Sequence, residues 1–306
     1  MVAELGVSNA HPGPTSHSGE PAMAEGDRRW LRNEAHALIL LCAMGALMGY
    51  CGWIVAGDRG IVWSVLLGLA LLAMIRHVSS DGVVKALRGR PLLGSRADVI
   101  AERLAALSKR AGLQSVPRLY HAPGELPLAL SLGDGDTAAI IVTDPLLQDL
   151  VGDELVGVLA HELIHLRNGD ILLMQWGLVL GWVTRIVSQV GCVLLLIGLA
   201  ANALSLVDYP LKSLVFLVFA PLLSTLLRLA LSRDREAEAD AEAAELTQDP
   251  DALASALIKL RERRRGTLKR LFPTVRSLHL PTLLADHPPT EERIRRLQQF
   301  RHRDAV

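Results

Sequence analysis

Residues 158–167 are Val-Leu-Ala-His-Glu-Leu-Ile-His-Leu-Arg, a stretch that places His161 and His165 four positions apart. Positions four apart lie on one face of an α-helix, so both imidazoles point to the same side. Glu162 follows the first histidine and projects beside that face. This His-Glu-x-x-His spacing lets two imidazoles hold one zinc ion, while the glutamate serves as a general base and not as a ligand.

The residues that flank the two histidines are apolar, which predicts that this helix is buried. Buried histidine and glutamate side chains are costly unless a metal ion or polar partners compensate them. A helix whose histidines hold no metal is the alternative, and the apolar flanks disfavour it. We therefore expect one Zn²⁺ per chain, which would lower the pKa of a water molecule toward ~7 and give a nucleophile at neutral pH.

A catalytic zinc site needs a third protein ligand, and no third histidine follows closely. The next acidic segment is residues 232–240, Ser-Arg-Asp-Arg-Glu-Ala-Glu-Ala-Asp. Small residues at Ala237, Ala239 and Ala241 would let this segment, as a helix, approach the zinc helix closely. Spacing alone does not choose among four carboxylates, those of Asp234, Glu236, Glu238 and Glu242.

Two apolar segments near the N-terminus predict a transmembrane hairpin. Residues 35–56 supply the ~20 residues that a spanning helix needs, and residues 61–75 form a shorter second span. The turn between them contains Asp58, Arg59 and Gly60. Arginines and lysines flank both ends of the hairpin, whereas the turn has only Arg59. The positive-inside rule therefore places both ends, and the chain that follows, in the cytoplasm.

A second apolar region covers residues 171–231 and is interrupted by Asp-Tyr-Pro at 208–210. We expect one span within 171–205 and another within 211–231, which gives about four membrane helices in all. Arg185 lies inside the first of these spans. Because a charge at the bilayer centre costs at least ~2.5 kcal/mol, we expect Arg185 to lie near an interface or to face the protein.

The composition is that of a membrane protein and excludes several other classes. The 306 residues carry 32 Lys+Arg and 32 Asp+Glu, and 50% of them are hydrophobic. A disordered chain would be poor in apolar residues, a nucleic-acid binder would be strongly basic, and three cysteines are too few for a disulfide scaffold. The lipid bilayer is therefore an expected partner and nucleic acid is not, while the oligomeric state stays open.

The remaining segments have the patterns of a soluble domain. Helical periodicity occurs at residues 97–112 and 154–167, and Asp144-Pro145 begins another helix. Strands are expected at 118–121, 126–132 and 137–143. The last of these, with its Ala-Ala-Ile-Ile-Val run, has the clearest pattern of a buried strand.

Two further motifs complete a recognisable series. The zinc helix continues into Asn168-Gly169-Asp170, and residues 286–297 contain Asp-His-Pro-Pro-Thr-Glu-x-Arg-Ile-x-x-Leu. Together with the hairpin, the apolar region and the Ser-Arg-x-Arg-Glu-x-x-Ala-Asp segment at 232–240, this order resembles the HtpX-like membrane zinc metallopeptidases, which are related to the CAAX prenyl proteases. The resemblance extends from about residue 35 to residue 300.

The resemblance implies an α+β fold: a mainly helical, zincin-type (gluzincin) peptidase domain with a small β-sheet, plus about four transmembrane helices. It also implies that Glu236 is the third zinc ligand, that Glu162 is the general base, and that Asp240 orients a zinc-bound histidine. The expected divisions are a flexible tail (1–33), a transmembrane hairpin (34–76), the first part of the peptidase domain with the zinc helix (77–170), two further membrane-embedded helices (171–231) and the second part of the peptidase domain with the third ligand (232–306).

Three residues near these motifs have open roles. The resemblance implies that His287 approaches the site and stabilises the oxyanion; a capping or hydrogen-bonded surface histidine is the alternative. Asp170 either caps the segment after the zinc helix or bonds a ligand histidine. Arg293 is expected to pair with an acidic group on a neighbouring helix. The basic run at 261–265 is either a solvated helix face or a contact with anionic lipid.

The chain departs from the resemblance at one edge strand. Relatives commonly have Asn-Ala-Phe beside the cleft, whereas this chain has Leu128, Ala129 and Leu130. A leucine cannot donate a hydrogen bond to substrate, so this polar contribution is missing. The strand can still bind an extended substrate by β-augmentation.

These observations predict an integral membrane zinc endopeptidase with its active site facing the cytoplasm. By resemblance, its task is quality control of membrane or misfolded proteins under stress. The alternative is a weak or inactive membrane scaffold that keeps the zinc fold, and Leu128 is its only support. The sequence contains no Gly-rich phosphate loop and no Gly-x-Ser-x-Gly motif, so nucleotide-driven and serine hydrolysis lack support.

Overall fold

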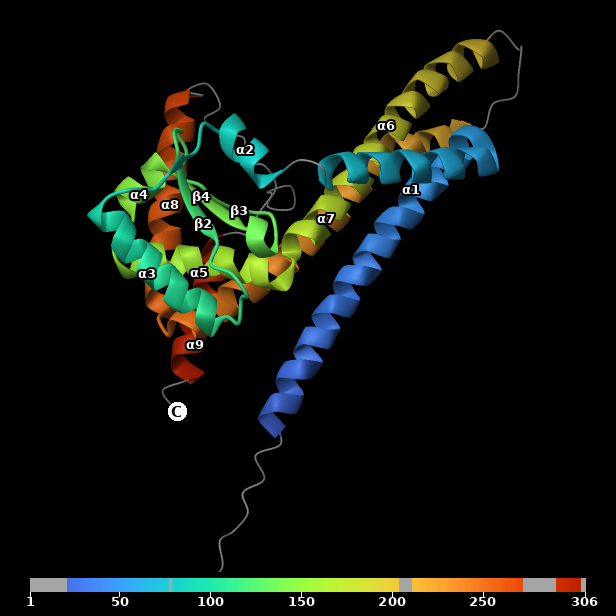
Figure 1. Ribbon diagram of the computed structural model, residues 1–306. Helices are drawn as coiled ribbons and strands as arrows, with labels where there is room; N and C mark the ends of the chain where they lie inside the picture. Colours follow the sequence, from blue (N-terminus) through green and yellow to red (C-terminus); the bar gives the residue numbers. More distant parts are fainter. Residues whose placement is uncertain (1–20, 77–78, 204–210, 272–289, 304–306) are drawn as a thin grey trace, which may run out of the picture. The chain divides into compact units, whose positions relative to one another are not determined.

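A computed structural model describes residues 21–76, 79–203, 211–271 and 290–303. The chain forms two units, residues 1–38 and 39–306, and the described part of the first unit is helical. Figure 1 shows a mainly helical protein with one small sheet. Its elements are α1 (Pro21–Arg76), α2 (Ser80–Ala86), β1 (Arg90–Pro91), α3 (Ser95–Arg110), β2 (Arg118–Ala122), β3 (Ala129–Leu132), a 3₁₀ turn (Gly135–Thr137), β4 (Ala139–Thr143), α4 (Asp144–Asp149), α5 (Asp153–Asn168), α6 (Asp170–Ala203), α7 (Leu211–Thr247), α8 (Pro250–Leu271) and α9 (Thr290–Arg303).

The sheet has the strand order β1-β2-β4-β3, so β3 is an edge strand. β2 and β4 are parallel, and β3 runs antiparallel to β4 with Leu130 opposite Ile141. β4 is almost wholly buried, as its apolar run predicts. The short strand β1 and the helix α2 were not expected from the sequence, whereas β2, β3 and β4 overlap the three predicted strands.

The core lies between the sheet and the helices that pack around α5. Because strand side chains alternate between faces, Ile140 and Val142 contribute to this core, while Ile141 joins a smaller cluster with Val84. α5 contributes more of the buried side chains in this core than any other element, and α7 contributes residues that include Ala239 and Ala243. Of the three small residues expected to allow α7 to approach α5 closely, Ala239 lies in this core, while Ala237 and Ala241 are partly exposed.

The apolar helices match the expected number of membrane segments. Among the described residues, three helices are long and apolar enough to cross a membrane, namely Glu34–Ile75, Asp170–Ala200 and Val215–Thr247. The first is broken at Ala56 and Gly57, where the backbone leaves the helical conformation. It therefore contains two apolar segments, and the total of about four stands. The break falls just before the expected turn at Asp58.

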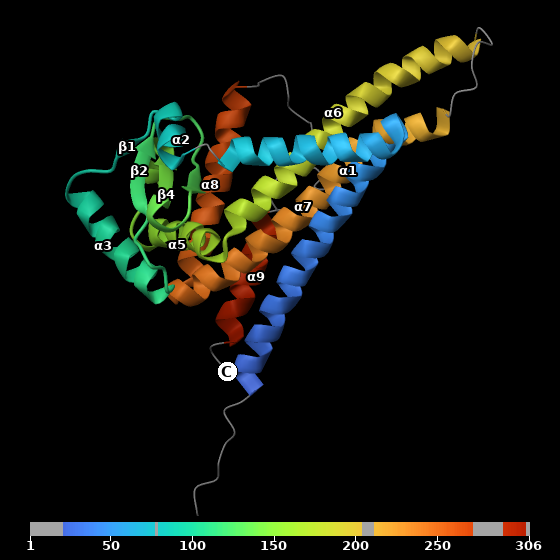
Figure 2. The ribbon, with the colours of Figure 1, turned by 45° about the vertical axis from the view of Figure 1, so that its right-hand side comes forward.

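Figure 2 shows the second arm of α1 turning back from this break, and α6 lying beside α7. The two arms touch where Met48 meets Gly68. Apolar side chains join the hairpin to α6, with Met44 and Leu72 packed against Val183. The described residues thus contain the predicted hairpin and a pair of long apolar helices that it packs against.

Helix α7 extends beyond the expected span, whereas α6 (Asp170–Ala203) matches the expected region 171–205 to within two residues at each end. α7 runs without interruption from its apolar part through Glu236 to Thr247, so the division expected at residue 231 falls inside a helix. Residues 21–33 of the expected tail are helical, and residues 1–20 lie outside the described part. Arg185 is exposed on α6, so it does not face the protein; a place near an interface remains the prediction.

Candidate metal centre

Helix α5 brings the two histidines of the motif to one buried face. His161 and His165 are 7% and 8% exposed, and their rings lie edge to face with centroids 4.7 Å apart. The helix ends at Asn168 because Gly169 adopts a left-handed conformation (φ 69°), which glycine takes without strain. This turn starts α6 directly at Asp170, one turn beyond the second histidine.

Helix α7 supplies one carboxylate to the same point. Ligand atoms of His161, His165 and Glu236 all lie within 4.8 Å of one another. The two Nε2 atoms are 3.2 Å apart, and Glu236 oxygens lie 3.6 Å from His161 Nε2 and 3.9 Å from His165 Nε2. Among the four carboxylates that spacing left open, Glu236 is the one in this cluster. Asp234, Glu238 and Glu242 are outside it.

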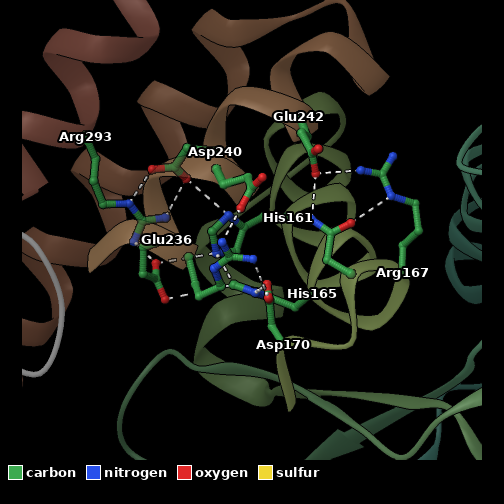
Figure 3. A network of polar contacts seen from close by, with 11 residues as sticks. His161, His165, Arg167, Asp170, Glu236, Asp240, Glu242 and Arg293 are labelled. Carbon is green, nitrogen blue, oxygen red and sulfur yellow. Dashed lines mark hydrogen bonds and ion pairs between the residues drawn. The ribbon is translucent and has the colours of Figure 1, made fainter. Parts of the chain in front are cut away.

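The opposite nitrogen of each imidazole faces a buried aspartate (Figure 3). His165 Nδ1 lies 2.8 Å from Asp170 Oδ2, and His161 Nδ1 lies 3.1 Å from Asp240 Oδ1. A carboxylate can only accept a hydrogen bond, so when the imidazoles are neutral, as metal binding requires, each Nδ1 carries the proton and each Nε2 presents a lone pair. Of the two roles open for Asp170, contact with His165, a candidate ligand, is the one observed.

This donor set fits a zinc ion. Two imidazoles and a carboxylate meet in a buried space, an arrangement that a bound cation stabilises. Zinc takes nitrogen and oxygen ligands at about 2.0–2.2 Å, so tetrahedral ligands lie roughly 3.3 Å from one another. The distances of 3.2–3.9 Å among the three residues are close to that spacing.

The electrostatics favour a positive charge at the same point. Burial lowers the pKa of His161, but Asp240 and Glu236 raise it more, and the outcome is a pKa of about 10. Carboxylates that stabilise a proton on an imidazole also stabilise a divalent cation beside it. Protons and metal ions therefore compete for this site.

Two arginines, the partly buried Arg293 and the buried Arg235, contact the carboxylates of the site. Arg293 of α9 donates two hydrogen bonds of 2.7 Å to Asp240, and its Nη1 lies 2.9 Å from Glu236. Burial lowers the pKa of Arg293, but Asp240 and Glu236 outweigh it, so this pKa is raised and the side chain stays charged. The expected pairing of Arg293 with an acidic group on a neighbouring helix is therefore present.

Arg235 is the second of these arginines, and the sequence reasoning missed it. It is 1% exposed, and its guanidinium lies 3.5 Å from Asp170 and 2.9 Å from Glu238. The arginine thus sits behind the aspartate that contacts His165. Its place beside Glu236 in the sequence was a signal, but its contact with Asp170 depends on how α6 and α7 pack.

A second polar link joins the ends of α5 and α7. Arg167 and Asn168 both donate to Glu242, over 2.6 Å and 2.8 Å (Figure 3). Two residues of the Asn168-Gly169-Asp170 motif therefore make contacts at the site: Asn168 donates to Glu242 of α7, and Asp170 contacts His165. Glu242, one of the open ligand candidates, belongs to this link.

Glu162 lines a cavity of about 200 Å³ beside His161 and Glu236. Leu128 and Ala129, just before and at the start of β3, line the same cavity, and Leu128 is 41% exposed. The departure from the Asn-Ala-Phe pattern therefore lies at the cleft itself. His287 lies outside the described residues, so the expectation for it stays a prediction.

A buried His-His-Glu cluster next to long apolar helices defines a metallopeptidase of membrane type. The sequence pattern of peptidase family M48 matches residues 96–301. The chain belongs to this family of metallopeptidases.

Similar proteins agree with this assignment. The chain is 31% identical to a protease HtpX homolog of Sulfurihydrogenibium sp., over 88% of this chain and 97% of that protein. It is 33% identical to another from Trichormus variabilis, over 87% and 96%. The crystal structure of S. mikatae Ste24p has a similar fold, with a TM-score of 0.50 at 20% identity. That match covers 88% of this chain and 65% of Ste24p.

Proposed function

We propose that this protein is an integral membrane zinc endopeptidase whose ligands are His161, His165 and Glu236. The observation that carries the proposal is the convergence of two Nε2 lone pairs and one carboxylate in a buried space. Asp170 and Asp240 fix the imidazoles in the orientation that a metal ion requires. Arg235 and Arg293 hold those two aspartates in turn.

Each group at the proposed active site has its own role in peptide hydrolysis. Zinc, when bound, would lower the pKa of the attacking water and polarise the scissile carbonyl. Glu162 accepts the proton from that water and returns it to the leaving amine. Glu162 lines the cavity beside two ligands, so its carboxylate is next to the reacting groups. His287 is the proposed donor to the oxyanion.

The free edge of β3 is the proposed place for the substrate backbone. Thr143 N–H donates to the Leu128 carbonyl, so Leu128, Leu130 and Leu132 exchange hydrogen bonds with β4. The backbone groups of Ala129 and Ser131 then point to the open side of the strand. An extended peptide can add there as a further strand and pass the cavity that holds Glu162.

The helices that carry the site also favour substrates at the membrane. α6 starts at Asp170, and α7 contains Glu236 in the same helix as its apolar part. We infer that the site lies close to the membrane surface, on the cytoplasmic side, and that membrane or misfolded proteins are its substrates. Its biological task would be quality control under stress.

Zinc content and cleavage by purified full-length protein test the proposal. The wild type should bind one zinc per chain and cleave an unfolded protein such as casein. Glu162→Gln should retain the zinc and lower kcat by about 10²–10⁴-fold, the usual contribution of a general base. Glu102→Gln, on the exposed face of α3, is the matched control and should behave as wild type.

The same measurements test the alternative that the protein is an inactive membrane scaffold. A scaffold would bind zinc and show the same absence of cleavage in all three proteins. Equal cleavage by wild type and Glu162→Gln would contradict the role of Glu162. A wild type without zinc would contradict the metal centre.

A further inference from the structure

The cavity beside Glu162 has a wall that the proposed chemistry does not use. Most of the residues that line it are apolar and come from four elements. Those that lie away from the ligands and β3 are Leu146 of α4, Val158 of α5, and Leu253, Leu257 and Leu260 of α8. A wall of this kind excludes water and fits a large apolar side chain.

Helix α8 changes character along the face that it presents to the cavity. Leu253, Leu257 and Leu260 follow one another at helical spacing. Arg261 and Arg264 continue the same face toward the C-terminal end of α8 and also line the cavity. The apolar wall therefore passes into a basic rim within about two helical turns, or roughly 10 Å.

The rim carries a net positive charge. Arg261 is paired with Glu291 of α9. Arg264 is exposed and, within the described residues, has no ion-pair partner. Arg293 also lines the cavity, but Asp240 and Glu236 compensate its charge. Arg264 is thus the guanidinium that is available to a substrate.

The position of Glu162 assigns the cavity to one side of the scissile bond. A carboxylate that returns a proton to the leaving amine must lie next to the nitrogen of the residue after that bond, the P1′ residue. Glu162 lines the cavity, so the apolar wall receives the P1′ side chain. In an extended substrate, P1′ and P3′ share one face and lie about 7 Å apart. The P3′ side chain therefore reaches the basic rim.

We propose that the wall and rim of α8 select a large apolar side chain at P1′ together with an acidic side chain at P3′. This selectivity rests on the proposed endopeptidase function. It adds side-chain preferences at P1′ and P3′ to the substrates proposed above, membrane or misfolded proteins. The basic run at 261–265, whose role the sequence left open, then contributes Arg261 and Arg264 to substrate recognition.

Internally quenched peptides that differ at one position test this selectivity with full-length protein in detergent. Leucine at P1′ should be preferred over alanine by about tenfold or more in kcat/KM, as expected for an apolar pocket. Glutamate at P3′ should be preferred over lysine severalfold at low salt, and this ratio should shrink at ~0.5 M salt because the charges are exposed.

Two variants of neighbouring arginines separate a local contact from a general charge effect. Arg264→Glu should reverse the preference between glutamate and lysine at P3′. Arg263→Glu makes the same change of charge one residue earlier, but Arg263 faces Asp149 and not the cavity, so the wild-type preference should persist. Leu260→Trp places a larger side chain in the apolar wall and leaves less space for the P1′ side chain. It should therefore shift the P1′ preference from leucine toward alanine.

The outcomes of these experiments test the side-chain selectivity separately from the proposed endopeptidase function. If wild type cleaves and Glu162→Gln does not, but leucine and alanine peptides are cleaved equally, the apolar wall has no selective role. An unchanged P3′ preference in Arg264→Glu overturns the role of the rim. If wild type cleaves no peptide or protein, both the selectivity and the endopeptidase function are wrong.

Discussion

The carboxylate of Asp170 has two partners at the site. One of its oxygens contacts His165 Nδ1, and the other lies 3.5 Å from the buried guanidinium of Arg235. Asp170 is also the first residue of α6. The residue therefore joins a ligand histidine to the start of a long apolar helix, and its two roles make different predictions.

Asp170→Asn should weaken zinc binding by about 10–100-fold, the usual effect of removing a carboxylate behind a ligand histidine. An amide no longer fixes the Nδ1 proton as strongly, so His165 is a poorer ligand. Competition with a chelator, followed by metal analysis, measures the change in Kd. Asp98→Asn on α3 is the control. If Asp170 only capped α6, stability would fall and the Kd would stay unchanged.

A substitution at Leu128 is expected to improve the site and not to weaken it. The Leu128 side chain lines the cavity next to Glu162, where an asparagine could donate a hydrogen bond to substrate. Leu128→Asn should raise kcat by about tenfold or more, since a single donor to the transition state is worth up to 10²–10³-fold. Leu130→Asn, two residues on and outside the lining of the cavity, should leave kcat unchanged. Equal effects of the two substitutions would refute the positional argument.

At the scale of elements, α5 is the part of the site that its sequence determines. The spacing of His161 and His165 fixes their common face, and the apolar residues between them fix its burial. The third ligand was different, because the chain offers four carboxylates on one helix. Only the packing of α7 against α5 brings Glu236 into reach and leaves Glu242 with Arg167.

Other features escaped prediction for similar physical reasons. β1 has only two residues, and pairing with β2, not its own pattern, makes it a strand. The two halves of α7 differ in composition, so the sequence suggested a boundary near residue 231 that the backbone does not have. Arg235 appeared to be one of several charges until α6 placed Asp170 beside it. In each case the missing information was a tertiary contact.

The contact between α5 and α8 depends on a glycine. A Cβ at Gly157 would lie 3.2–3.3 Å from backbone and Cβ atoms of Leu253, which is tighter than ordinary contacts. Gly157→Ala should therefore lower the free energy of unfolding by about 1–3 kcal/mol, as overpacking does, although alanine is favoured in helices. Gly266→Ala, with open space around it, should be neutral or stabilising. Thermal unfolding of both variants checks this, and a stabilised Gly157→Ala would count against the close packing.

The same two helices are joined by a charge pair with a defined pH dependence. Burial raises the pKa of Glu154, but Lys259 and Ser255 lower it further, so the pKa in the folded protein is below 4.5. A lowered pKa stabilises the fold above the unfolded value, and this contribution is lost as the pH falls through the folded value.

Glu154→Gln should therefore destabilise by about 0.5–1 kcal/mol at pH 7 and by progressively less as the pH falls through the lowered pKa of Glu154. The difference in unfolding midpoint between this variant and wild type, followed as the pH is lowered, measures the effect. Glu245→Gln on exposed α7 surface should show no such trend. A difference that stayed constant with pH would mean that the charge of Glu154 does not contribute.

On the scale of the whole molecule, the neutral sum of 32 positive and 32 negative residues hides a segregated distribution. The long helices have apolar segments, and the charges collect in the peptidase domain, where Arg235 and Asp170 form a buried pair at the candidate metal centre. Helices α6 and α7 each contain an apolar segment and a residue of the site, Asp170 in α6 and Glu236 in α7. The peptidase domain is therefore joined to the membrane segments through these two helices. The orientation of the chain in the membrane therefore decides which compartment supplies the substrates.

The distribution of basic residues predicts that orientation. Arg59 is the only basic residue at the break of α1, whereas Arg88 and Arg90 follow the hairpin closely, so the break should face outward and the domain the cytoplasm. In a variant whose three native cysteines are replaced by serine or alanine, a cysteine at position 59 should react with a membrane-impermeant maleimide in intact cells. A cysteine at position 110, on exposed α3, should react only after the membrane is permeabilised. The reverse pattern would place the site outside the cytoplasm, and labelling of both positions in intact cells would mean that the hairpin does not return across the membrane.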